Sequence, residues 1–279
     1  LNDDLDNMLG QIDEHRSAIE AGADRAAPRA LMPAGGARNG VDCALWELEA
    51  AQAGRPVWQL AGLSAPKPLV TTFTLGADDP EKMAEGARIY EAAKAIKIKL
   101  TGEVGLDLAR VKAVRAARPD VWIGVDANQG YAIDGLAALV DMLAANAVEL
   151  LEQPLARGRE RDLDGFDSPI PIAADESALA FADVAGLVGR FDIVNIKLDK
   201  CGGLTEALAM ASLAPELGLA VMVGNMMGSS WAMGPAFVLG QLCDIVDLDG
   251  PTFLATDRSP AIVYQEGTVW CPGEVWGGG

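Results

Sequence analysis

Residues 95–126 read AIKIKLTGEVGLDLARVKAVRAARPDVWIGVD, and the fold class can be inferred from them. This stretch opens with a β-branched run at 95–100, continues through a helix-period segment at 105–119, and ends in a second β-branched run at 121–126. Two strands joined by one helix form a βαβ unit, in which the strands are parallel. The stretch therefore predicts a parallel sheet covered by helices.

The same alternation extends along the chain from Pro68 onward. Candidate strands lie at 69–75, 95–100, 121–126, 148–152, 169–175, 192–198, 219–224 and 244–249. Helix-period stretches lie between them, at 79–94, 105–119, 132–146, 178–190, 204–218 and 229–242, and only the connection after Glu152 is weak. Eight strands over about 180 residues favour a closed (β/α)7β barrel of the TIM type over an open doubly wound sheet. No G-x-G-x-x-G motif follows the first strand, so a dinucleotide-binding fold has no support.

The segments on either side of the barrel have different patterns. Residues 1–65 contain amphipathic helical stretches with no strands between them, so we expect the helical part of a partial α+β capping domain there. We expect residues 66–255 to form the barrel and residues 256–279 to return to the cap. Within that tail, AIVYQEGTVWCPGE (261–274) alternates apolar and polar residues around a Glu-Gly pair, which predicts a β-hairpin.

Composition excludes several classes of function. The chain of 279 residues carries a formal net charge of −18, which disfavours binding to nucleic acids and to anionic membrane surfaces. Its longest apolar runs fall short of the ~18–20 residues of a membrane span, and its four cysteines lack C-x-x-C spacing, so we expect a cytoplasmic protein with reduced thiols. His15 is the one histidine, so acid/base chemistry must rest mainly on lysines and carboxylates. The sequence leaves a homo-oligomer open.

Three carboxylates lie at the ends of three consecutive predicted strands. They are Asp126, Glu152 and Asp175, each one βα repeat from the next. In barrel enzymes the chemistry takes place at the carboxyl ends of the strands. With no histidine or cysteine among them, these residues form a hard oxygen site suited to Mg²⁺.

Lysines lie at the same end of the predicted barrel. Lys97 and Lys99 are two residues apart on one strand, so their side chains share a face, and Lys197 comes from a strand across the barrel. Two ammonium groups near each other and near a divalent cation lower each other's pKa, which makes a lysine usable as a general base. With a metal holding an enolate oxygen, one lysine could remove a proton and the other return it to the opposite face. Asp247 and Asp249, at the mouth of the last strand, suit the binding of a cation.

Six motifs occur in order along the chain. They are KIK (97–99), VDAN (125–128), LLEQP (150–154), ADES (174–177), NIKLDKCGG (195–203) and DLD (247–249). Together they resemble the muconate-lactonizing subgroup of the enolase superfamily, and within it the dipeptide epimerases such as L-Ala-D/L-Glu epimerase. The resemblance covers about residues 68–260, and the helices of 1–65 resemble part of that family's capping domain.

The resemblance implies a role for each of these residues. It implies that Asp126, Glu152 and Asp175 ligate Mg²⁺, which binds the substrate carboxylate. It implies that Lys99 and Lys197 are acid/base catalysts on opposite faces of the substrate α-carbon. Lys97 would help neutralise the enolate charge and depress the pKa of Lys99, and Asp247 and Asp249 would hold the free α-ammonium of a dipeptide.

The function implied is Mg²⁺-dependent epimerisation of the C-terminal residue of a dipeptide, with L-Ala-D/L-Glu as the default substrate. Two alternatives stay open. One is another enzyme of the subgroup, an N-acylamino acid racemase, an o-succinylbenzoate synthase or a cycloisomerase, whose substrate would leave Asp247 and Asp249 without a role. The other is a non-catalytic, truncated barrel. Members of the family begin with strands and a mobile loop, which we expect to be missing before Leu1, together with the usual partner of the C-terminal tail.

Overall fold

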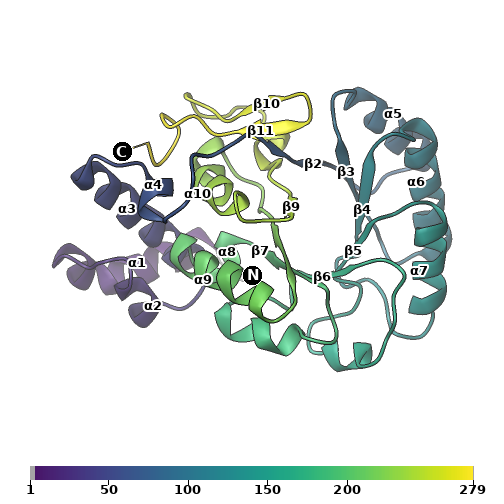
Figure 1. The fold of residues 1–279 in the computed structure, drawn as a ribbon, viewed down its shortest axis with the longest axis horizontal. Helices are drawn as coiled ribbons and strands as arrows, with labels where there is room; N and C mark the ends of the chain where they lie inside the picture. The colour runs from purple at the N-terminus through teal and green to yellow at the C-terminus, as the bar shows by residue number, and fades with distance from the viewer. Residues whose placement is uncertain (1–3, 279) are drawn as a thin grey trace.

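The computed structural model describes residues 4–278, and an eight-stranded parallel sheet forms its centre (Figure 1). Neighbours in this sheet follow the order of the chain, and the sheet curves into a nearly closed barrel, which confirms the predicted fold class. The strands are β2 (Thr72–Leu75), β3 (Ala95–Lys99), β4 (Trp122–Asp126), β5 (Leu150–Glu152), β6 (Ile172–Ala174), β7 (Ile193–Ile196), β8 (Ala220–Val223) and β9 (Ile245–Val246).

Side-chain hydrogen bonds close the seam between the first and last strands of the barrel. Within residues 4–278 no ladder joins β2 to β9. Instead, the backbone N–H of Leu248 donates to Thr71 Oγ1 at 2.9 Å, and the N–H of Thr74 donates to Asp249 Oδ2 at 2.6 Å. Asp249 therefore has a structural contact in addition to its place at the barrel mouth.

Helices cover the outside of the barrel. They are α5 (Pro80–Ile89), α6 (Val104–Ala117), α7 (Leu136–Ala145), α8 (Leu198–Cys201), α9 (Leu204–Glu216) and α10 (Ser230–Gly240). The connections after β5 and β6 contain the short 3₁₀ helices η1 (Glu160–Leu163) and η2 (Phe181–Leu187). The segment 178–190 is therefore helical where a helix was predicted, but its helix is a 3₁₀ helix and not an α-helix. Asp183 accepts a hydrogen bond from the N–H of Leu179 at 2.9 Å, which shapes the start of this tighter turn.

The barrel interior is apolar at one end and charged at the other. Side chains of one strand alternate between inside and outside, so every second residue faces the interior. Leu150, Ala173, Ile193 and Met222 form a buried cluster towards the amino ends of the strands. Two residues further along three of these strands the side chains are polar: Glu152, Asp175 and Asn195. The strand pattern thus gathers charged groups at the carboxyl end.

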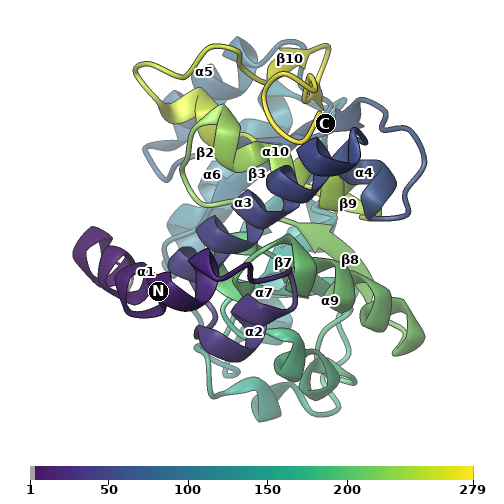
Figure 2. The ribbon, with the colours of Figure 1, turned by 90° about the vertical axis from the view of Figure 1, so that its left-hand side faces the viewer.

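Residues 4–60 form four helices beside the barrel (Figure 2). They are α1 (Leu5–Glu20), α2 (Ala27–Leu31), α3 (Gly36–Ala53) and α4 (Val57–Leu60). The longest of them, α3, packs against α8 and α9 of the barrel. Among residues 4–278 there is no helix with the length and apolar character needed to cross a membrane.

The C-terminal tail forms the predicted hairpin, from β10 (Val263–Gln265) and β11 (Thr268–Trp270). Its turn residues Glu266 and Gly267 have φ of 50° and 73°, as a two-residue hairpin turn with both residues left-handed requires.

The structure adds two details to the expected pairing of this hairpin. Within residues 4–278, β11 of the hairpin pairs with β1 (Leu69–Val70). The predicted strand at 69–75 is also divided, because β1 pairs with the tail while β2 begins the barrel. The apolar pattern of 69–75 fits both sheets equally and cannot indicate where the chain passes from one to the other.

Asp107, near the start of α6, holds the loop that follows β3. Its carboxylate accepts hydrogen bonds from the N–H of Thr101 at 3.0 Å, the N–H of Gly102 at 2.9 Å, Arg110 Nη1 at 2.7 Å and the Tyr131 hydroxyl at 2.7 Å. Burial raises the pKa of Asp107, but the hydrogen bonds, led by that from Tyr131, outweigh it, and the pKa lies below its ordinary value.

Replacing Asp107 with alanine is expected to destabilise the protein by about 3 kcal/mol, because the buried Arg110 charge loses its partner. Tyr131→Phe, which removes one hydrogen bond, should cost about 1 kcal/mol. Since the folded pKa of Asp107 is depressed, its contribution is present above about pH 4 and is lost as the pH falls further. Urea unfolding of both variants at pH 7 measures the difference, and equal losses would contradict the assigned role.

Candidate active site

A cavity of about 420 Å³ opens at the carboxyl ends of the barrel strands. The structure brings all eight residues singled out in the sequence to this cavity or directly beneath it. Six of them line it: Lys97, Lys99, Asp175, Lys197, Asp247 and Asp249. The other two, Asp126 and Glu152, are fully buried beside Asp175. His15 lies on α1 and is not part of the cavity wall.

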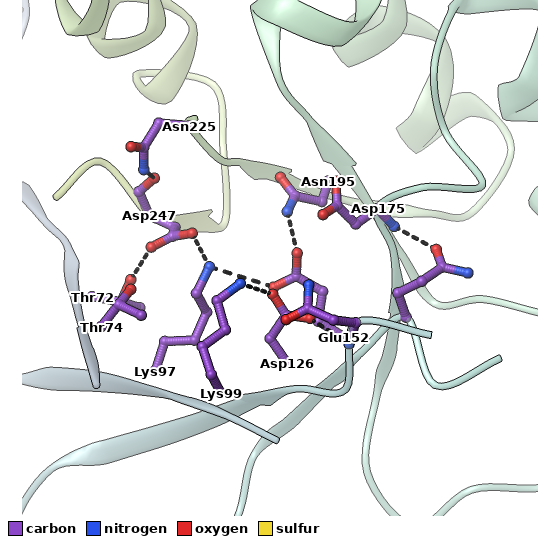
Figure 3. Close-up of polar contacts among 12 residues, drawn as sticks. Thr72, Thr74, Lys97, Lys99, Asp126, Glu152, Asp175, Asn195, Asn225 and Asp247 are labelled. Atoms are coloured by element: carbon purple, nitrogen blue, oxygen red, sulfur yellow. Dashed lines mark hydrogen bonds and ion pairs between the residues drawn. The ribbon is translucent and has the colours of Figure 1, made fainter. Parts of the chain in front are cut away.

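The three carboxylates of Asp126, Glu152 and Asp175 form a compact acidic triad. One oxygen of each lies within 4.8 Å of the others. The triad is placed by strand register, because Asp126 and Glu152 are paired across β4 and β5 (Figure 3). Asn195 on β7 donates to Glu152 Oε1 at 2.7 Å and so fixes the orientation of that carboxylate.

The triad fits a hard divalent cation. Glu152 Oε2 is buried and has no hydrogen-bond partner anywhere in the described chain. Burial and the nearby charge of Asp126 raise the pKa of Glu152 to about 7. A buried, unpartnered carboxylate oxygen is costly, and a cation among the three carboxylates would compensate it. Three converging carboxylates without nitrogen or sulfur ligands are the donor set that Mg²⁺ prefers.

A lysine faces each carboxylate of the triad. The nitrogen-to-oxygen distances are 2.5 Å for Lys99 and Asp126, 2.7 Å for Lys197 and Asp175, and 3.7 Å for Lys97 and Glu152. Lys99 ends β3 and Lys197 follows β7, and these two strands are four positions apart in the eight-stranded barrel. Lys99 and Lys197 therefore approach the triad from opposite sides.

The carboxylates around Lys97 and Lys197 determine the direction in which the pKa of each lysine is shifted. Burial lowers the pKa of Lys97 and of Lys197, but nearby carboxylates outweigh it, and both pKa values lie above the ordinary value. Asp247 has the largest opposing effect on Lys97, and Asp175 on Lys197.

The two aspartates after β9 have unequal surroundings. Asp247 forms an ion pair with Lys97 and accepts a hydrogen bond from Thr72 Oγ1 at 2.5 Å. Asp249 accepts from the N–H of Thr74, and within residues 4–278 no lysine or arginine lies within ion-pair distance of it. Burial, followed by the charge of Asp247, raises the pKa of Asp249 to about 6. Asp249 is therefore the better placed of the two to receive a cationic group from the cavity.

Two further residues of the site, Lys200 and Asn195, were not identified from the sequence. Lys200 Nζ donates to both the backbone oxygen and Oδ1 of Asp175 at 2.5 Å and to the backbone oxygen of Asn195 at 3.0 Å. Burial raises the pKa of Asp175, but Lys200 and Lys197 together hold it below its ordinary range. The alternation of strand 192–198 places Asn195 on the same face as Lys197, and that signal could have identified it.

Family comparisons cover most of the chain. Residues 2–62 match the model of the mandelate racemase / muconate lactonizing enzyme N-terminal domain, and residues 81–253 match the enolase C-terminal domain-like model. The L-Ala-D/L-Glu epimerase of Escherichia coli K12 is 40% identical over 265 residues, which are 94% of this chain and 82% of that protein. An N-acetyl-D-glutamate racemase of a Pseudoalteromonas species is 40% identical over 238 residues, 85% of this chain and 75% of that protein.

Solved structures agree with this relationship. An enolase family member from Agrobacterium tumefaciens with homology to dipeptide epimerases, bound to sodium and L-Ala-L-Glu, superposes with a TM-score of 0.93 at 39% identity, over 99% of this chain and 84% of that chain. The dipeptide epimerase of Enterococcus faecalis, complexed with Mg and L-Leu-L-Tyr, superposes with a TM-score of 0.90 at 29% identity, over 99% of this chain and 83% of that chain. The chain therefore belongs to the mandelate racemase / muconate lactonizing enzyme family of the enolase superfamily.

Proposed function

We propose that this protein is a Mg²⁺-dependent dipeptide epimerase that inverts the α-carbon of the C-terminal residue, with L-Ala-L-Glu and L-Ala-D-Glu as its substrate pair. The observation that carries the proposal is the placement of Lys99 and Lys197 on opposite sides of the acidic triad. The names and bound ligands of the relatives support the same reaction.

The mechanism follows from the positions of the two lysines. Asp126, Glu152 and Asp175 would hold the Mg²⁺ ion, which supplies positive charge to stabilise the negative charge that develops on the substrate carboxylate. Neutral Lys99 removes the α-proton from one epimer, and the ammonium of Lys197 delivers a proton to the opposite face of the same carbon. In the reverse direction the two lysines exchange roles, so one proton leaves the carbon and one reaches it in each turnover.

The amino end of the dipeptide is assigned to Asp249. A free α-ammonium carries a positive charge, and the Asp249 carboxylate is buried at the cavity wall without an ion-pair partner in the described chain. An N-acylated substrate has no such charge. The alternative function, racemisation of an N-acylated amino acid, is favoured by the similarity to the N-acetyl-D-glutamate racemase. Asp249 is therefore the residue that distinguishes the two functions.

Replacing Asp249 with asparagine is expected to lower kcat/KM for L-Ala-L-Glu by about 10²-fold, because a charge-assisted contact to the ammonium is lost. The carboxamide keeps an oxygen that can accept from the N–H of Thr74, so the seam of the barrel is preserved. N-acetyl-L-Ala-L-Glu serves as the matched substrate and should be poor for both proteins. If the unmutated protein turned over N-acetyl-D-glutamate faster than the free dipeptide, the racemase would be the better assignment.

Turnover itself is tested by incubating the purified protein with Mg²⁺ and L-Ala-L-Glu and separating the epimers by chiral chromatography. We expect L-Ala-D-Glu to accumulate until the two epimers reach equilibrium. Other dipeptides are assayed in parallel, because E. faecalis provides a relative that binds L-Leu-L-Tyr. Calorimetric binding of Mg²⁺ without turnover of any dipeptide would support the non-catalytic alternative.

A further inference from the structure

The backbone that carries Lys197 continues directly into a single helical turn. Lys197 precedes α8, and its carbonyl oxygen accepts from the N–H of Lys200 at 2.9 Å and from the N–H of Cys201 at 3.0 Å. Both Lys197 and Lys200 contact the carboxylate of Asp175. A displacement of α8 would therefore move one of the two proposed acid/base lysines and the contacts of one triad carboxylate together.

The far end of α8 is held by Arg38 of α3, a helix outside the barrel. The Arg38 guanidinium donates to the backbone oxygen of Cys201, the last residue of α8, and lies 3.3 Å from Glu206 Oε2 at the start of α9. Arg38 is only 5% exposed. The approach is so close that a Cβ on Gly202, whose φ is 81°, would lie 2.1 Å from Arg38 Nε. Only a glycine at this position allows the contact.

Neighbouring residues on the same face of α3 bind the same segment. Asn39 Nδ2 donates to Asp199 Oδ1 at 3.1 Å within α8, and the carboxylate of Asp42 accepts from the N–H of Thr205 at 3.0 Å within α9. Spacings of three and four residues place such side chains on one face of a helix. The α3 helix thus contacts α8 and the beginning of α9 with a row of polar side chains in which Arg38 makes the contact to the end of α8.

Lys99 is supported by a different part of the molecule. It ends β3, and the loop after it is held by Asp107 of α6, on the opposite side of the barrel from α8 (Figure 1). Within residues 4–278, α3 makes its most extensive contacts with α1, α2, α4, α8 and α9, and neither β3 nor α6 is among them. The contacts of Arg38 itself are on the Lys197 side of the site.

We propose that Arg38 is a positioning residue for Lys197, and that the helical cap thereby controls proton transfer on one face of the substrate only. The inference rests on the proposed two-lysine mechanism. Removing the guanidinium leaves the buried Cys201 carbonyl without this donor, so the end of α8 must shift to find another partner. Glu206 keeps its ion pair with Arg29 at 2.7 Å, so α9 remains held to the cap. A misplacement of about 1 Å in a catalytic group can lower its rate by about 10²-fold.

The test compares the two epimers. Exchange of the α-proton in D₂O is measured separately for L-Ala-L-Glu and L-Ala-D-Glu with the Mg²⁺-loaded protein. The Lys197→Met variant first identifies which epimer gives its proton to Lys197. Arg38→Met is expected to slow exchange of that same epimer by about 30- to 100-fold and to leave exchange of the other within about threefold.

Arg118→Met is the matched control. Arg118 is also a buried arginine, 8% exposed, that donates to the backbone oxygen of Ala93 and pairs with Asp120, but it lies at the amino end of the barrel. Because its contacts are with the segment that leads into β3, its loss should not slow selectively the exchange of the epimer that depends on Lys197. Arg38→Lys, which keeps the charge and one donor, should slow exchange of the same epimer by a smaller factor. If Arg38→Met does not fold, Arg38→Lys tests whether Arg38 positions Lys197.

Equal slowing of both epimers in both Arg38 variants would overturn the positioning role, and so would the absence of any effect or the same selective slowing in Arg118→Met. The failure of the proposed function is distinguishable from these outcomes. It would appear as the absence of exchange for both epimers in the unmutated protein.

Discussion

The Lys197→Met variant is expected to lose epimerisation by at least about 10³-fold while still exchanging the α-proton of one epimer with solvent. The reason is geometric. Lys197 serves one face of the α-carbon and Lys99 the other, so the epimer whose proton faces Lys99 can still release and regain it. Proton NMR in D₂O follows the loss of the α-proton signal from each epimer separately. Methionine keeps much of the apolar volume of the lysine side chain and lacks its ammonium group.

Lys99→Met is the mirror-image variant and serves as the control. It should also abolish epimerisation, but it should preserve exchange of the opposite epimer. Loss of exchange from both epimers in both variants would indicate a general collapse of the site. Continued epimerisation in either variant would show that the two-lysine assignment is wrong.

Removing the divalent cation is expected to have an effect of similar size. The acidic triad is fully buried, and Glu152 Oε2 has no hydrogen-bond partner in residues 4–278. Chelation by EDTA should therefore abolish turnover, and added Mg²⁺ should restore it. Glu152→Gln separates ligand loss from misfolding, because the amide retains an oxygen that can accept from Asn195.

Glu152→Gln should bind Mg²⁺ about 10²-fold more weakly in calorimetry and should epimerise at least about 10²-fold more slowly. In the absence of any metal, the same variant should melt at a higher temperature than the unmutated protein, because one of three buried carboxylates that lie close together has lost its charge. A lower melting temperature for the metal-free variant, together with unchanged Mg²⁺ affinity, would contradict the assignment of Glu152 as a ligand.

The sequence could predict the place of the site because strand periodicity reports which face and which end of the barrel a residue occupies. Lys97 and Lys99 are two residues apart and do share the interior, and Asp126 and Glu152 do lie side by side in register. A barrel with consecutive βα units leaves few alternatives for where these side chains meet. The roles of the residues rest on the variants described above.

The contacts between residues could not be predicted in the same way. Lys97 pairs with Asp247, which follows β9 at the other side of the seam, and periodicity carries no information about distances across a barrel. Lys200 lies in a one-turn helix that directs its side chain back to Asp175, a turn too short to leave a periodic signal. Arg38 lies on an amphipathic helix like many others, and its contact with α8 depends on Gly202 having no side chain.

The most direct test of the two-lysine mechanism is the isotope content of the first product formed in D₂O. Protiated L-Ala-L-Glu is incubated with the Mg²⁺-loaded protein, and the L-Ala-D-Glu formed at low conversion is isolated and examined by mass spectrometry. If one lysine removes the proton and the other delivers a solvent-derived one, the new epimer carries deuterium at its α-carbon from the first turnover. A product that keeps the protium of the substrate would show that a single base serves both faces, and it would contradict the assignment of Lys99 and Lys197 to opposite faces.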